Sequence, residues 1–323
     1  TGGAGYIGSH TVRALLSSDS FTPVIFDNLS TGHAESVPEG TVLVKGDIHD
    51  IDFVADTLKK YDIKGVIHFA AYSLVGESMV DPAKYYTNNV EGTLHLLLGM
   101  KKAGVDKIVF SSTAAVYGEP EKTPIEEDLP HNPTNVYGRT KLVIENMMKD
   151  FTSAYGLHYV ALRYFNAAGA ALDGSIGEDH NPESHLIPLI LKTAQGVRDH
   201  IAIYGTDYPT PDGTCIRDYI HVLDLADAHV LAMKYLADGG KSTYFNLGSE
   251  KGFSVREIIE TAKKVTGIDF KVTEEARRSG DPAVLIASSK KCRETLGWHP
   301  THSNTEEIIA SAWKWHKEHP YGY

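Results

Sequence analysis

The glycine-rich segment at residues 1–10 constrains the fold of this chain more than any other feature of the sequence. Gly2, Gly5 and Gly8 recur at a spacing of three, directly before residues with helical periodicity. Such glycines permit a tight turn, let the backbone approach a pyrophosphate and allow the helix to pack closely on a sheet. The N-terminus of that helix offers free N–H groups and positive dipole to phosphate. The segment therefore predicts a phosphate-binding turn between a strand and a helix.

An acidic residue at the end of the next apolar run extends this prediction. Residues 23–27 are typical of a short buried strand, and they end in Asp27, about 20 residues after the turn. A carboxylate at this place binds the adenosine ribose diol and repels a 2′-phosphate, so the sequence favours NAD over NADP. Because a turn of this type normally follows a buried strand, we expect that further residues precede Thr1.

Apolar runs alternate with helical patterns through the first half of the chain. The patterns predict strands at 41–44, 65–71, 107–113 and 159–164, and helices at 51–60, 82–103 and 135–155. Strands that are apolar throughout and are separated by helices indicate a parallel sheet covered on both faces. Ligands bind such sheets at the carboxyl ends of the strands. Asp27, Asp47, Ala70, Ser111 and Thr113 all fall at these ends.

The pattern becomes irregular beyond Asn166. Loops rich in glycine or proline are expected at 167–182 and 208–215, helices at 185–196, 223–236 and 305–316, and a strand at 201–204. We therefore expect a dinucleotide-binding domain over residues 1–166 and a smaller mixed α/β substrate domain over 167–323. Some segments of the second part are expected to return to the first sheet.

Charge and cysteine content exclude several classes of function. The 31 Lys and Arg against 42 Asp and Glu give a net charge of −11, which argues against nucleic acid or an anionic membrane as partner. Cys215 and Cys292 lie far apart and form no redox or metal-binding pair, so a reducing cytoplasm is expected.

The 16 histidines are scattered without ligand spacing, so no metal site is expected. No apolar run approaches the roughly 18–20 residues that span a bilayer.

Tyr137 and Lys141 stand four residues apart just after Asn135, a residue typical of a helix N-cap. On a helix the two side chains share one face, and an ammonium near the phenol favours the phenolate. Tyr137 is then a candidate base, although the pKa of free tyrosine is about 10. The spacing alone is equally typical of an ordinary helix turn. Hydroxyls at a preceding strand end, above all Thr113, would add a group that orients an alcohol.

Motifs along nearly the whole chain resemble the extended short-chain dehydrogenase/reductase family, and within it the enzymes that epimerise nucleotide sugars. They are TGGAGYIGSH, FDN, HFAAYSLVGES, SSTAAVYG, YGRTK, RYFNAAGA, GTCIRDYIH and RRSGDPA. The resemblance implies a Rossmann-type doubly wound α/β fold. It also implies an isomerase that interconverts UDP-glucose and UDP-galactose through a 4-keto intermediate, using tightly bound NAD. A cytoplasmic homodimer, formed through the helices at 82–103 and 135–155, is expected by the same likeness.

The resemblance also implies roles for individual residues. Tyr137 would take the proton of the sugar 4-hydroxyl, Lys141 would hold the nicotinamide ribose and lower the pKa of the tyrosine, and Thr113 would bridge substrate and phenol. The cofactor contacts would come from Gly2, Gly5, Tyr6, Ile7, Gly8, Asp27, Asn28, Asp47, Ile48, Phe69, Ala70, Ala71, Asn88, Ser111, Tyr137, Lys141, Tyr164 and Phe165. The UDP-sugar would be held by Thr113, Tyr137, Asn166, Leu186, Ala202, Ile203, Tyr204, Arg217, Arg278, Asp281 and Leu285.

Three residues depart from the family pattern. Ser73 stands where many members carry a lysine near the cofactor, and His185 replaces a common asparagine. Leu285 falls where residue size is linked to the admission of N-acetylated sugars, and leucine is of intermediate size. Turnover of N-acetylated UDP-sugars is therefore left open.

Other functions are compatible with the same fold. A net nucleotide-sugar dehydrogenase or reductase and a non-catalytic NAD-binding regulator are the alternatives. A 4,6-dehydratase normally carries an acidic pair after the strand-end threonine, where this chain has Ala114 and Ala115. No G-x-S-x-G motif supports hydrolase chemistry.

Overall fold

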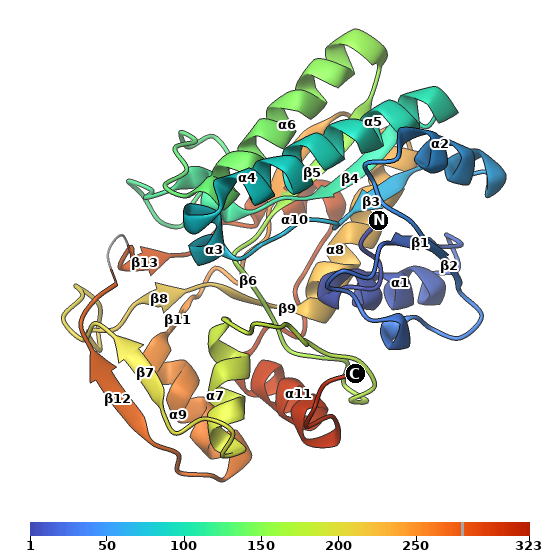
Figure 1. Ribbon diagram of the computed structural model, residues 1–323. Coiled ribbons are helices and arrows are strands. Elements are labelled where there is room, and N and C mark those ends of the chain that lie inside the picture. The colour runs from blue at the N-terminus through green and yellow to red at the C-terminus, as the bar shows by residue number, and fades with distance from the viewer. Residues whose placement is uncertain (279–280) are drawn as a thin grey trace.

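The computed structural model describes residues 1–278 and 281–323. Ser279 and Gly280, which belong to the motif RRSGDPA, lie outside the described residues. A helix-covered parallel sheet forms one part of the molecule, and short strands and helices of the second half form the other (Figure 1).

The strands of the helix-covered sheet are parallel, as the apolar runs predict. Four of them pair in the order β10 (Thr243–Asn246), β5 (His158–Arg163), β4 (Lys107–Ser111) and β3 (Val66–His68). β1 (Val24–Asp27) pairs in parallel with β2 (Val42–Lys45). The first two residues join these sets, because the Thr1 backbone nitrogen donates to the Ile67 carbonyl and the Gly2 N–H donates to the Phe26 carbonyl.

Helices cover both faces of this sheet (Figure 1). One face carries α2 (Ile51–Lys60), α5 (Gly92–Ala103) and α6 (Val136–Tyr155), and the other carries α1 (Tyr6–Ser17) and α8 (Val222–Ala237). On β4, Ile108 and Phe110 pack into the core under α5 and α6, whereas Val109 packs into the core under α8. Burial on both faces explains why the strands are apolar throughout.

The long helix expected at 82–103 is confirmed in its bounds, but a π-helical turn lies inside it. The segment consists of α4 (Pro82–Tyr85), a π-helical turn η2 (Tyr86–Glu91) and α5, and an unpredicted helix α3 (Val75–Val80) precedes it. Within the π-turn, Asn89 is fully buried and hydrogen-bonds both the N–H and the carbonyl of Tyr72. A π-turn inside a helix commonly occurs at a functional site, and Asn88 from this turn lines the cavity described below.

The second half of the chain builds a separate core of short elements. Its strands are β6 (Asn166–Ala168), β7 (Ile201–Tyr204), β8 (Ile216–Arg217), β9 (Tyr219–His221), β11 (Phe253–Ser254), β12 (Val272–Glu275) and β13 (Val284–Leu285). Its helices are α7 (Leu186–Ala194), α9 (Val255–Thr266), α10 (Lys290–Leu296) and α11 (Thr305–Glu318). The predicted strand at 201–204 and the three predicted helices are confirmed within a few residues. β10 returns to the first sheet, while the functional division at residue 166 stays a prediction.

Within the described parts of the chain, no helix is both long and apolar enough to cross a bilayer.

A buried ion pair ties the sheet to α6. The Arg163 guanidinium on β5 has no exposed surface and donates from Nε to Glu145 Oε1 at 2.9 Å. Glu145 also accepts the Ser112 hydroxyl at 2.6 Å, and Arg163 donates to the Tyr117 hydroxyl at 2.7 Å. Protein groups therefore supply hydrogen-bond partners to both charges, which fixes the position of α6 on the strands.

Substitution Glu145→Gln is expected to lower the free energy of unfolding by about 3–5 kcal/mol, because it leaves the buried Arg163 charge uncompensated. Urea denaturation measures the change. As control, Lys102→Gln breaks an exposed pair with Asp52 and should leave the free energy of unfolding almost unchanged. Equal losses in the two variants would contradict the importance of the buried pair.

Candidate active site

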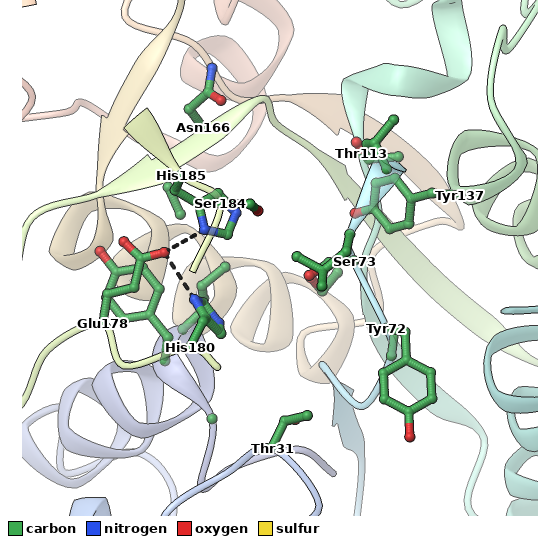
Figure 2. A pocket seen from close by; sticks show the side chains of 18 of the residues that line it. Thr31, Tyr72, Ser73, Thr113, Tyr137, Asn166, Glu178, His180, Ser184 and His185 are labelled. Carbon is green, nitrogen blue, oxygen red and sulfur yellow. Dashed lines mark hydrogen bonds and ion pairs between the residues drawn. The ribbon is translucent and has the colours of Figure 1, made fainter. Parts of the chain in front are cut away.

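A cavity of about 920 Å³ lies at the carboxyl ends of the parallel strands and extends toward the second half of the chain. Figure 2 shows a close view of it, with Tyr137 and Thr113 on one side and Glu178, His180 and His185 on the other. A volume of this size is at the upper end of the range for small-molecule sites. The cavity collects almost every residue that the sequence predicted for ligand contact.

The glycine loop forms one end of this cavity. Gly2 has a φ of 72°, and a Cβ on Gly8 would lie 2.1 Å from the Gly2 carbonyl oxygen, so side chains are excluded there. α1 begins after Gly5, and among the described residues no side chain caps its first turn. Its N-terminal N–H groups therefore stay available for a phosphate, and the loop fits the pyrophosphate of a dinucleotide.

Asp27 is fixed beside this loop. Its side chain ends β1, is almost fully buried, and accepts N–H bonds from Ala4 and Leu29 at 2.9 Å each. The carboxylate thereby faces the loop with a set orientation, as a ribose diol would need. Asn28 and Asp47 lie next to it, joined by a hydrogen bond of 3.2 Å.

Tyr137 and Lys141 lie on one face of α6, as predicted. The Asn135 side chain accepts the Gly138 N–H at 2.7 Å and so caps the helix as expected. The ammonium of Lys141 lies 5.7 Å from the centre of the Tyr137 ring and donates to the Ser111 carbonyl at 2.8 Å. The Tyr137 hydroxyl points into the cavity beside Thr113 (Figure 2).

The electrostatics of this pair differ from the expectation. Burial raises the pKa of Tyr137 to about 12, which its hydrogen bond with Thr113 only partly offsets. Burial likewise lowers the pKa of Lys141 to about 7, against the attraction of Glu145. The prediction that Lys141 lowers the phenol pKa is therefore wrong for the protein alone. Loss of hydration is the largest cause of both pKa shifts, and the Lys141 ammonium donates to the Ser111 carbonyl instead of the phenol.

The predicted substrate residues all line the cavity, with one exception. Arg217 and Arg278 converge on Asp281, at 3.7 Å from its Oδ1 and 2.8 Å from its Oδ2. Two guanidinium groups against one carboxylate leave a net positive charge for an anionic ligand. Ile203 is the exception, because it is 1% exposed and packs into the core between β7 and α7. Its predicted contact with the ligand is not supported.

Several cavity residues were not predicted from the sequence. They include Ser30, Thr31, Gly32, Tyr72, Glu178, His180, Ser184, Arg198, Cys215 and Tyr219. Ser73 and His185, the two departures from the family pattern, also line the cavity. The expectation that the histidines are scattered without ligand spacing does not hold for the loop at 178–185, where two histidines and two glutamates lie close together. Its alternation of acids and histidines was the signal that could have revealed this group.

The fold and the site define an α/β enzyme of the dinucleotide-dependent class. The model of the NAD dependent epimerase/dehydratase family matches residues 1–248, and the chain belongs to this family. The resemblance seen in the sequence is thereby confirmed.

Known proteins match the chain over its full length. The UDP-glucose 4-epimerase of Lacticaseibacillus casei is 54% identical over 322 residues, covering 100% of this chain and 97% of that protein. The crystal structure of UDP-glucose 4-epimerase from Brucella ovis in complex with NAD has 50% identity and a TM-score of 0.94, covering 97% and 95% of the two chains. The UDP-Glc/GlcNAc 4-epimerase of Campylobacter jejuni has 42% identity and a TM-score of 0.87, covering 98% of each chain.

Substitution Lys141→Met is expected to change how stability depends on pH. In the unfolded chain this lysine holds its proton up to its usual pKa of 10.5, whereas in the folded protein its pKa is about 7. The unfolded state therefore binds more protons between pH 7 and 10, and stability rises with pH in that range. Below pH 7 the full cost of burying the Lys141 charge lowers the stability of the parent protein. The Lys141→Met variant has no charge to bury, so its stability advantage over the parent protein shrinks as pH rises.

Urea unfolding of the ligand-free protein at pH 7 and pH 9.5 measures this difference. Lys149→Met, on the exposed side of the same helix, serves as control and should run parallel to the parent protein. If the free energies of unfolding of Lys141→Met and the parent protein differ by the same amount at both pH values, the pKa of Lys141 is not lowered in the folded protein.

Proposed function

We propose that this chain is an isomerase that interconverts UDP-glucose and UDP-galactose by reversible oxidation at sugar C4 with tightly bound NAD. The observation that carries the proposal is one continuous cavity bordered by the glycine loop, Tyr137 and two arginines. Full-length likeness to proteins named UDP-glucose 4-epimerase supports it. The reaction would pass through a UDP-4-keto-sugar.

The residues at the cavity wall supply the proton chemistry. NAD, held by the glycine loop and Asp27, would supply the acceptor and donor of the hydride that C4 loses and regains on its other face. Tyr137 takes the proton of the 4-hydroxyl and gives it back, while Thr113 beside it orients that hydroxyl. For this the pKa of Tyr137 must fall below its ligand-free value, and a protonated Lys141 on the same helix face is the group that would lower it.

The opposite end of the cavity would hold the nucleotide. Arg217 and Arg278 suit the diphosphate, because their planar groups can pair with phosphate oxygens. Inversion at C4 requires that the hydride returns to the opposite face of the ketone. The sugar must therefore turn over while the diphosphate and uridine stay fixed, and the two arginines would hold the diphosphate during that motion.

We also propose that residues 1–166 bind NAD, that residues 167–323 bind the UDP-sugar, and that the enzyme works in the cytoplasm as a homodimer. α5 and α6 lie side by side on the outer face of the sheet (Figure 1). Val143 is exposed there, and Leu94 and Leu98 are partly exposed, which suits a helix-on-helix contact between subunits. Both cysteines are free, as a reducing compartment would keep them.

The decisive assay uses purified protein and UDP-galactose without added NAD. UDP-glucose should form without net NADH. Release of NADH would instead identify a dehydrogenase, and a dehydrated keto-sugar would identify a dehydratase. Absence of any reaction would favour a non-catalytic NAD-binding regulator.

In this assay Tyr137→Phe should lower kcat by about 10²–10⁴-fold, the usual contribution of general acid–base catalysis. NAD content and thermal stability should be retained, since only the hydroxyl is removed. The matched control is Tyr86→Phe, a tyrosine outside the cavity that is 40% exposed. Near-full activity of Tyr137→Phe would show that another group is the base.

Leu285→Tyr tests the admission of N-acetylated sugars. Leu285 lines the cavity from β13, and a larger ring there would fill space that an acetamido group needs. The ratio of kcat/KM for UDP-N-acetylglucosamine to that for UDP-glucose should fall at least about tenfold, or roughly 1.4 kcal/mol. Val284→Ile, one residue away and outside the cavity lining, should keep the ratio. An unchanged ratio in Leu285→Tyr would show that this residue does not determine the admission of N-acetylated sugars.

A further inference from the structure

Four side chains with metal-ligand chemistry converge in the loop before α7. Glu178, His180, Glu183 and His185 each offer one ligand atom, and these atoms all lie within 4.8 Å of one another. Glu178, His180 and His185 form the cavity wall opposite Tyr137 (Figure 2). The proposed epimerisation requires a base, an orienting hydroxyl and a diphosphate clamp, and it gives none of these roles to the four side chains.

The distances within this cluster match those around a small divalent cation. His185 Nδ1 lies 2.8 Å from Glu178 Oε1 and 2.9 Å from Glu183 Oε1. His180 Nδ1 lies 3.1 Å from Glu178 Oε1 and 3.8 Å from Glu183 Oε2. Ligands placed about 2.0–2.1 Å from a tetrahedral zinc ion are about 3.3–3.4 Å from one another. Three of these distances are shorter than this value and one is longer, so an ion could enter after the side chains shift by a few tenths of an ångström to about half an ångström.

Burial makes the two carboxylates dependent on positive charge. The side chains of Glu178 and Glu183 are only 7% and 3% exposed, and both face the same point. Removing two like charges from water at one place is unfavourable unless cations accompany them. Two imidazoles that carry protons or one divalent ion between neutral imidazoles would each balance the pair.

The surrounding backbone holds the cluster in place. Glu183 Oε1 accepts the N–H groups of Ser184 and His185 at 2.7 Å each, which fixes the carboxylate. The indole N–H of Trp315 donates to the Glu178 carbonyl at 3.2 Å. Such outer contacts orient ligands in metal sites and reduce the cost of assembling them.

We propose that Glu178, His180, Glu183 and His185 form a four-coordinate site for a divalent cation of the zinc class. Two imidazole nitrogens and two carboxylate oxygens suit zinc, whereas magnesium and calcium prefer oxygen alone. Four protein ligands fill the tetrahedron and leave no position for substrate, so the site is structural. The ion would fix the loop that joins the glycine-loop end of the cavity, where His180 packs against the Tyr6 ring, to the start of α7.

The test is metal binding by the whole chain. Protein treated with EDTA and freed of it is titrated with Zn²⁺ in competition with a chromogenic chelator, and metal content is measured by mass spectrometry. We expect about one tightly bound Zn²⁺ per chain, with a submicromolar Kd, tighter binding at higher pH because the ligands must lose protons, and a higher melting temperature. Binding only at millimolar Zn²⁺ would overturn the proposal without any variant.

Variants then locate the ion. Glu183→Gln and His180→Asn should each weaken Zn²⁺ binding by at least about 100-fold, the upper range for loss of a supporting group. Asp179→Asn, in the same loop, is the matched control, because its carboxylate accepts the Tyr323 N–H outside the cluster. Circular dichroism verifies folding, and either ligand variant suffices if the other fails to fold. Equal affinity in the parent protein and a folded ligand variant would mean that the cluster forms ion pairs only.

Discussion

The carboxylate of Glu145 is the constraint on which the arrangement of the site depends. It is nearly inaccessible to solvent, and it bonds Arg163 on β5 and Ser112 beyond β4 at the same time. These contacts fix the rotation of α6 about its own axis and its position along the sheet. Lys141 lies one turn earlier on the same helix, and Tyr137 another turn before it. A shift of this helix would therefore move the candidate base away from the strand ends where the glycine loop and Thr113 lie.

Features with a local physical cause could be predicted from the sequence. The glycine loop, the strand ending in Asp27 and the cap of α6 by Asn135 follow from short-range sterics and hydrogen bonds, and the structure has all three. Other features depend on distant partners. The π-turn in the helix segment accompanies the bonds between Asn89 and the backbone of Tyr72, which no pattern of apolar residues announces.

The missed site features have similar explanations. Alternation along β7 turns Ala202 and Tyr204 toward the cavity and Ile203 toward the core, so a face assignment could have excluded Ile203. The pKa values of Tyr137 and Lys141 could not be foreseen, because they follow from burial by segments far away in the chain. The loop at 178–185 lacks periodicity, and only the folded chain shows that both of its glutamates are shielded from water.

The pairing of β10 with β5 has a consequence for the integrity of the molecule. β10 comes from the second half of the chain, yet it supplies the outermost strand beside β5. A fragment that stops after residue 166 would leave the backbone N–H and carbonyl groups along β5 open, and exposed strand edges recruit other chains. Cutting the polypeptide after residue 166 would thus expose the edge of β5 and favour aggregation, so the first 166 residues would not form an independent folding unit.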